Sequence, residues 1–326
     1  MVRPISVVLA LTGFLSTANA DPVPKKSAAE TFVVKESGVV VFLDSDGKAK
    51  ERRDRNATYE KLSPDGRWLA YIASSGEPLR SQFFIQSRER KDDPAILPLV
   101  WDRPGLSGCL YLWAGDSKRV LIGENRQTRP GSRRLEYAYR VYELAPGKLS
   151  ELKLPDGHWV TGWSPDGKRF LTTAHMGDGG VRIAWIRADG TGEPEFITPE
   201  DEIAYGASLS RDGQHILFLA RATGSTGARA GVRLYAMELA TKKRTTVDEP
   251  GETDGYCWSP DGSKIAYTWQ RSLDKPAEVK ERETLLITCN ADGSNRKTIT
   301  KRRYQMPENS NGGSGIVFFF EVLDWR

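Results

Sequence analysis

The sequence predicts an all-β fold, and three observations lead to it. A phrase of the form apolar-Ser-Pro-Asp-Gly recurs along the chain, a short apolar run follows each copy, and the copies are evenly spaced. Counted from the aspartate in each copy, the steps are 46 to 51 residues. Even spacing at this period is typical of stacked supersecondary units such as propeller blades. We therefore expect one domain built from repeated small antiparallel sheets.

Each copy of the phrase predicts a tight turn between two strands. Proline fixes φ at the first central position, aspartate bonds to nearby backbone N–H groups, and glycine takes a left-handed φ. The runs after the turns, such as 68–73 and 215–220, are short and apolar, as in strands buried on both faces. Paired catalytic carboxylates must lie within about 5–10 Å of each other, whereas these aspartates belong to separate units. We therefore assign a structural turn role to Asp65, Asp116, Asp166, Asp212 and Asp261.

The strands can be followed in chain order. Segment 31–53 predicts three strands, and five full units of four antiparallel strands then begin near residues 57, 107, 158, 203 and 253. Segment 315–326 predicts one last strand, which completes a sixth unit with 31–53. Such a ring has no free sheet edge between its first and last units. The expected fold is a six-bladed β-propeller of four-stranded blades, closed by three N-terminal strands and one C-terminal strand in one blade.

The first 20 residues predict a cleaved secretory signal peptide. A basic start precedes an apolar run from Ile5 to Leu15, and Ala18-Asn19-Ala20 gives the small-x-small cleavage pattern, so we expect the mature chain to begin near Asp21. The run is too short to span a bilayer, so no transmembrane segment is expected after cleavage; an uncleaved anchor is the alternative. Residues 21–30 are then a short linker, and 31–326 form a single propeller domain. The expected location is periplasmic or secreted.

The repeat resembles the TolB-type propeller repeat, also called the PD40 or WD40-like repeat. The resemblance is carried by the Ser-Pro-Asp-Gly turns and by the Ala-Asp-Gly-Thr and Ala-Asp-Gly-Ser turns at 188–191 and 291–294. It covers about residues 31–326 and implies the propeller fold and an exported location. TolB itself has an additional domain ahead of its propeller, whereas here only residues 21–30 separate the leader from the first strand.

The charge of the chain narrows the classes of partner to expect. The formal net charge is +4, from 47 Lys and Arg against 43 Asp and Glu. The basic residues form no concentrated stripe, so we expect no nucleic-acid binding.

Cys109, Cys257 and Cys289 are too few for a disulfide framework and are expected to be buried free thiols, with a Cys257–Cys289 bridge as the alternative.

Binding residues are expected on the longer loops, which share the propeller face opposite the repeated turns. Loops on a rigid scaffold carry function, and arginines there offer forked donors to carboxylates or phosphates. The alternative is that these are ordinary solvated charges. The candidate residues for a ligand or partner are Arg80, Arg103, Arg126, Arg133, Arg134, His175, Arg221, Arg229, Arg302 and Arg303.

No motif for catalysis, metal binding or cofactor binding is found. His158 and His175 are fewer than the three protein ligands of a catalytic metal, and no nucleophile elbow or phosphate loop is present. We therefore expect no catalytic residue, no metal and no cofactor. The leading hypothesis is an exported, non-catalytic binding or scaffold protein that presents a loop face or central funnel to an envelope protein or an anionic polymer. The alternatives are a propeller enzyme, of lyase or hydrolase type, acting on an anionic saccharide, and a structural assembly subunit.

Overall fold

The structure is a computed structural model. It describes residues 30–36, 39–53, 57–75, 80–89, 94–101, 110–127, 135–177, 179–224, 231–248, 252–272, 281–305 and 320–325. The expected signal peptide, its cleavage point and all of the linker except Glu30 lie outside this part of the chain.

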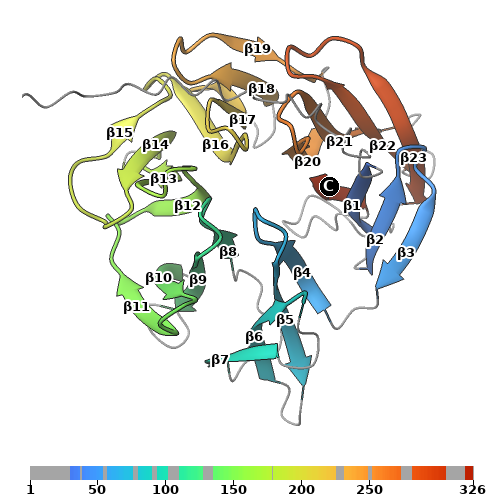
Figure 1. Cartoon of the computed structure of the whole chain (residues 1–326). Coiled ribbons are helices and arrows are strands. Elements are labelled where there is room, and N and C mark those ends of the chain that lie inside the picture. The colour runs from blue at the N-terminus through green and yellow to red at the C-terminus, as the bar shows by residue number, and fades with distance from the viewer. Residues whose placement is uncertain are drawn as a thin grey trace, which may run out of the picture.

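The described chain forms six four-stranded antiparallel sheets around a central axis, as Figure 1 shows. We call them blades 1 to 6 and their strands A to D from the axis outward. Blades 1 and 2 consist of β4 (Ala57–Leu62), β5 (Trp68–Ser75), β6 (Arg80–Ser87) and β7 (Pro94–Trp101), then β8 (Leu110–Trp113), β9 (Arg119–Gln127), β10 (Leu135–Glu143) and β11 (Lys148–Leu152). Blades 3 and 4 consist of β12 (His158–Trp163), β13 (Arg169–His175), β14 (Val181–Arg187) and β15 (Glu195–Phe196), then β16 (Glu202–Leu209), β17 (His215–Ala222), β18 (Arg233–Glu238) and β19 (Arg244–Thr246).

Blade 5 consists of β20 (Glu252–Trp258), β21 (Lys264–Ser272), β22 (Glu281–Asn290) and β23 (Lys297–Gln305). Blade 6 joins the two ends of the chain, because β24 (Phe320–Trp325) pairs with β1 (Thr31–Glu36), which is followed by β2 (Val39–Asp44) and β3 (Ala49–Arg53). In this pairing Phe32 stands opposite Trp325, and the two rings lie 4.9 Å apart. The predicted six-bladed ring with a shared closing blade is therefore confirmed.

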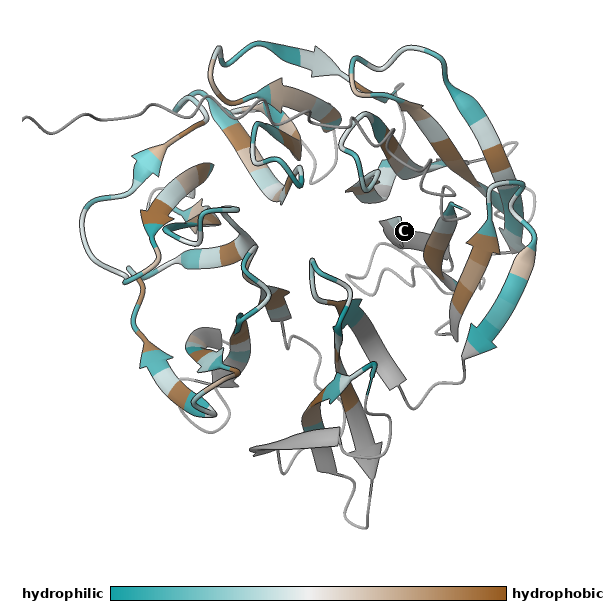
Figure 2. Cartoon of the chain, in the orientation of Figure 1, coloured by the Kyte–Doolittle hydropathy of each residue, from teal (hydrophilic) through white to brown (hydrophobic). Residues whose placement is uncertain are grey.

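The core lies between neighbouring blades, so the central strands are buried on both faces. Leu121 packs toward blade 3 while its neighbour Ile122 packs toward blade 1, and both are fully buried. Phe170 and Leu171 divide in the same way between blades 2 and 4. Apolar residues accordingly concentrate on the inner strands, whereas the outer strand β3 is hydrophilic in Figure 2. This explains why the strand runs are continuously apolar rather than alternating.

Tyrosine hydroxyls connect blade 2 to the blades on both of its sides. The hydroxyl of Tyr111 in blade 2 donates to the carbonyl of Ala70 in blade 1. Tyr139 donates to the carbonyl of His158 in blade 3 and accepts the N–H of Val160 at 3.0 Å. These bonds engage the backbone of inner strands and fix the angle between blades.

The two described cysteines lie on opposite faces of blade 5. Cys257 packs against blade 6 with Phe32, and Cys289 packs against blade 4 with Leu234. Both are buried free thiols, so the alternative Cys257–Cys289 bridge is not formed, and Cys109 lies outside the described residues. The described part of the chain contains no helix able to cross a membrane.

Candidate functional site

A cavity of about 590 Å³ lies where the A–B turns of blades 1 to 4 meet. Its wall comes from the ends of strands β4, β8, β12 and β16 and from the turns that follow them. The A strands are the innermost strands of their sheets, so the cavity lies near the axis of the ring, on the face that carries the A–B turns. Its lining residues include Lys61, Pro64, Asp65, Trp113, Gly115, Asp116, Ser117, Trp163, Pro165 and Arg211.

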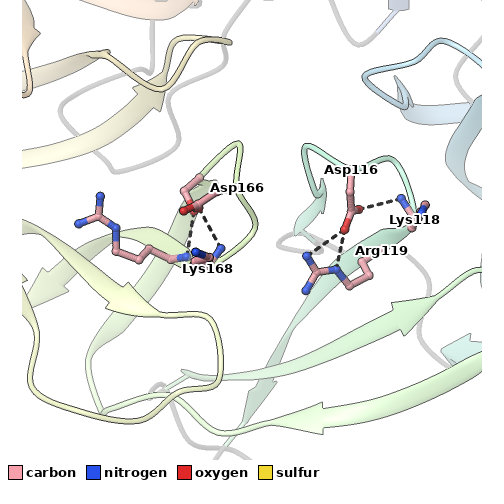
Figure 3. Close-up of polar contacts among 7 residues, drawn as sticks. Asp116, Lys118, Arg119, Asp166 and Lys168 are labelled. Carbon is pink, nitrogen blue, oxygen red and sulfur yellow. Dashed lines mark hydrogen bonds and ion pairs between the residues drawn. The ribbon is translucent and has the colours of Figure 1, made fainter. Parts of the chain in front are cut away.

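Each regular turn is closed by its own serine and aspartate. In blade 3, Ser164 Oγ donates to Asp166 Oδ1 at 2.7 Å and accepts the N–H of Arg169, while Asp166 Oδ1 accepts the N–H of Lys168. Figure 3 shows Asp166 with Lys168 beside the corresponding turn of blade 2. The bond from Ser164 holds the pKa of Asp166 below its usual value, so this carboxylate is charged at neutral pH.

Two turns depart from the Ser-Pro-Asp-Gly phrase, and both line the cavity. Blade 2 has 114–117 as Ala-Gly-Asp-Ser, and blade 4 has arginine in place of proline at Arg211. Ser117 takes a φ of 57°, at the position where the other four turns have glycine. Asp116 binds Arg119 through its carboxylate instead of a turn serine, as Figure 3 shows.

These departures bring the turns together across the axis. A Cβ on Gly115 would lie 2.5 Å from the carbonyl oxygen of Pro165, and one on Gly213 would lie 2.7 Å from the proline ring. Ser117 Oγ accepts the N–H of Asp65 at 3.0 Å. Arg211 Nη2 donates to the carbonyl of Pro64 at 2.8 Å, between blades that are not neighbours in the ring. The turn ends of blades 1 to 4 are thus mutually packed around the cavity.

One wall residue carries an unused hydrogen-bond donor. Trp113 Nε1 donates to Lys61 O and Trp258 Nε1 donates to Ser208 O, both at 3.1 Å and both in the preceding blade. Trp163 stands at the same place in its repeat, but its Nε1 is buried and has no partner in the described structure. The guanidinium of Arg119 lies 5.0 Å from the Trp163 ring. Because this nitrogen is enclosed by the protein, its unmade hydrogen bond costs stability, and the N–H is not presented to the cavity.

None of the predicted arginines that the structure describes lines this cavity. Arg302 and Arg303 lie on the outer strand β23, where Arg302 Nε bonds Glu36 of β1 at 2.8 Å and Arg303 Nε bonds Glu283 of β22 at 3.1 Å. Arg221 lies on β17 opposite Ile203. Arg80 begins β6 and Arg126 lies on β9. Four further candidates lie outside the described residues, namely Arg103, Arg133, Arg134 and Arg229.

The histidines lie at the two ends of the blades. His158 begins β12 and His175 ends β13, at the end opposite the A–B turn, whereas His215 begins β17 beside its turn. Thr172 donates its hydroxyl proton to Ala184 O, so the 3.1 Å contact with His158 Nδ1 places a proton on that nitrogen. Burial lowers the pKa of His158 and of His175. Within the described residues, no group of three or more His, Cys, Asp or Glu side chains is arranged to hold a metal ion.

The sequence did not predict this cavity, because the binding residues were expected on the longer loops of the opposite face. The signal that could have found it is the pair of turns that break the repeat, at Gly115 and Arg211. A turn that only connects two strands does not require the glycine at 115 or the arginine at 211. What the sequence could not show is that these two turns meet in space.

Comparison with known proteins gives likeness at the level of structure. No protein-family model and no curated protein matches the sequence. TolB from Acinetobacter baumannii superposes with a TM-score of 0.58 at 17% identity, over 83% of this chain and 63% of that one. The putative TolB from Agrobacterium tumefaciens gives 0.56 at 16% identity, over 84% and 89% of the two chains. The oligogalacturonate lyase from Vibrio parahaemolyticus gives 0.53 at 13% identity, over 80% and 70%.

The chain therefore spans less than two thirds of the Acinetobacter TolB. At identities this low, the superpositions show a shared fold and not a shared activity. On the blade arrangement, the closing blade and these superpositions, the chain has the fold of a TolB-like six-bladed β-propeller.

Proposed function

We propose that this chain is a non-catalytic binding protein whose partner inserts a group into the cavity at the A–B turn mouth. The observation that carries the proposal is that both turns departing from the repeat line this cavity, together with the regular turns of blades 1 and 3. A concave, partly apolar site with a few convergent polar groups is the usual form of a binding site. The likeness to TolB-type propellers is consistent with a binding role but does not assign it.

The charges at the cavity favour an anionic group on the partner. Asp65 and Asp116 are engaged by their own turns and by Arg119. Arg211 donates to a neutral carbonyl, which leaves its positive charge uncompensated by that contact. With Lys61 on the same wall, the cavity offers donors to a carboxylate or similar acceptor. An envelope protein or an anionic polymer, the partners suggested by the sequence, would supply such groups.

The test is capture from an envelope extract by the mature domain. We expect the wild-type domain to retain a partner at low salt, and Arg211→Ala with Lys61→Ala to lose most of it. The matched control is Arg187→Ala, which removes an exposed arginine paired with Asp189 in an outer turn. Equal recovery by the cavity variant and wild type would contradict the proposal. Loss of recovery only in a variant with Arg133 and Arg134 changed to alanine would place binding on the longer loops instead.

The proposed location is the periplasm or the exterior, with the leader removed. N-terminal mass analysis of protein from the soluble envelope fraction should give a chain beginning at Asp21. A chain that keeps Met1 and sediments with membranes would support the uncleaved anchor instead.

The second hypothesis, an enzyme acting on an anionic saccharide, is favoured only by the position of His175 at the far mouth of the channel. Reducing-end release from polygalacturonate, measured for wild type and His175→Ala, tests it. Activity that depends on His175 would overturn the non-catalytic proposal.

A further inference from the structure

The tripeptide Pro-Asp-Gly occurs in two different backbone settings in this chain. Three copies, at 64–66, 165–167 and 260–262, belong to the A–B turns of blades 1, 3 and 5. The fourth copy, at 155–157, lies in the connection that leads into β12, at the end of blade 3 opposite its A–B turn. Because the tripeptides are identical, any difference in their chemistry within the folded protein comes from the fold.

An aspartate followed by glycine can rearrange without an enzyme. The backbone nitrogen of the glycine attacks the side-chain carboxyl carbon, a C–N bond forms, and the N–H proton leaves with the carboxyl hydroxyl as water, which gives a cyclic succinimide. Water then adds to one of the two ring carbonyl groups. Addition at the side-chain carbonyl restores aspartate, whereas addition at the main-chain carbonyl gives isoaspartate, whose backbone runs through Cβ and Cγ. Glycine favours the attack because it has no side chain to hinder it.

The A–B turns hold both of the groups that would react. Gly167 N donates to the carbonyl of Ser164 at 2.8 Å, so the attacking nitrogen is engaged and its peptide unit is fixed. Asp166 Oδ1 accepts hydrogen bonds from Ser164 Oγ and Lys168 N, which orient the carboxylate and favour its ionised form, a poor electrophile. The turns that contain Asp65 and Asp261 make the same set of bonds.

The turn at 155–158 holds neither group, because it is shifted by one residue. It closes from His158 N to Pro155 O over 3.4 Å, so Gly157 is its third residue, whereas the glycine of each A–B turn is the fourth. Gly157 has a φ of 77°, and its N–H has no acceptor in the described structure. The carboxylate of Asp156 has no hydrogen-bond or ion-pair partner among the described residues either, and both residues are exposed.

The other Asp-Gly pairs of the chain also have an engaged glycine nitrogen. Five of these glycines donate to the carbonyl three residues earlier at 2.9 to 3.1 Å, namely Gly47, Gly179, Gly190, Gly213 and Gly293. Gly255 N donates to Thr268 Oγ1 at 3.0 Å. Among the described residues, Asp156-Gly157 is therefore the one Asp-Gly pair whose glycine N–H has no acceptor.

We propose that Asp156 is a site of spontaneous isoaspartate formation, because the fold leaves both its carboxylate and the N–H of Gly157 unengaged. The site lies where the chain enters the innermost strand of blade 3. Gly157 O accepts the N–H of His175 at 2.9 Å, and the next residue, His158, is buried. Isoaspartate adds one methylene group to the backbone immediately before these contacts. The proposal is independent of the A–B turn cavity and of the partner proposed there.

The test is incubation of the folded protein near neutral pH, followed by trypsin digestion and mass spectrometry with electron-transfer fragmentation. Cleavage after Lys153 and Lys168 leaves Asp156 and Asp166 in one peptide, so both sites are measured in the same molecule. We expect isoaspartate to accumulate about tenfold faster at Asp156 than at Asp166, where a hydrogen bond of ordinary strength must break before the glycine nitrogen can attack.

Two controls separate the effect of the fold from that of the local sequence. In concentrated guanidinium chloride the two Pro-Asp-Gly sites should isomerise at similar rates, because the bonds that distinguish them are lost. Asp156→Glu should abolish the product at residue 156, since its longer side chain must close a larger, less favourable ring, and should leave the rate at Asp166 unchanged. Equal rates at the two sites of the folded protein, a faster rate at Asp166, or a difference that persists in denaturant would each overturn the proposal.

Discussion

At the residue scale, the turn serine performs two tasks with one hydroxyl. Ser164 donates to Asp166 and accepts the N–H of Arg169, and Ser63, Ser210 and Ser259 do the same in their own turns. In blade 2 this position is Ala114, and the turn relies on Asp116 with Arg119. The same local fold is therefore reached through two different sets of bonds.

Replacing Ser164 by alanine should lower the free energy of unfolding by about 1–2 kcal/mol, because two hydrogen bonds are lost at a buried position. Denaturant unfolding measures it. The control is Ser150→Ala, on a half-buried residue of the outer strand β11, which should change stability by less than about 0.5 kcal/mol. An equal loss for both variants would argue against the special role of the turn hydroxyl.

The buried histidine predicts a loss of stability in acid. Burial lowers the pKa of His158, so below the usual histidine pKa of about 6.5 the unfolded chain binds more protons than the folded one. The free energy of unfolding should therefore fall from pH 7 toward pH 5, and it should not depend on this group above pH 7. Thermal unfolding of His158→Gln should show a smaller fall over that interval than wild type. An unchanged pH slope in the variant would contradict this.

At the element scale, the A–B turns do more than connect two strands. The turns of blades 1 to 4 contact one another, and each of these four turns forms part of the wall of the cavity. The glycine at 115 is required by this contact and not by its own φ, because Pro165 occupies the space that a side chain would need.

Gly115→Ala should therefore destabilise the protein by about 1–3 kcal/mol, the usual cost of overpacking. Gly177→Ala is a matched control, since an added Cβ there would meet no atom within 4 Å. Thermal unfolding of the two variants should separate them clearly. If they unfold alike, the turn contact is not a source of stability.

The strands and blades were predictable from the sequence, but the cavity was not. Repeat spacing and turn chemistry depend on local sequence, so residues 57, 158, 203 and 253 fall within one residue of the observed starts of their blades. The meeting of Gly115, Pro165 and Arg211 depends on the angle between blades, which no single repeat encodes. The exposure of Trp159 could not be predicted either, because an aromatic residue near the start of an apolar strand normally indicates burial.

At the scale of the whole molecule, the ring depends on its closing blade. Trp325 is 4% exposed and packs with Phe32 and with Cys257 of blade 5, so the last strand joins the sheet of blade 6 to its neighbour. Trp325→Ala should cost about 3–5 kcal/mol through the cavity it leaves. Trp159→Ala removes the same side chain from an exposed site and should cost much less. Denaturant midpoints compare the two variants, and similar losses would mean that the closing blade contributes little.

The shared blade also determines when the ring can be completed during synthesis of the chain. Strands β1 to β3 are synthesised before the strands of the other five blades, whereas their inner partner β24 is synthesised after them. Until β24 has been made, the nascent polypeptide must keep an incomplete sheet from pairing with other chains. A ring joined in this way gains its full stability only after all six blades have been synthesised.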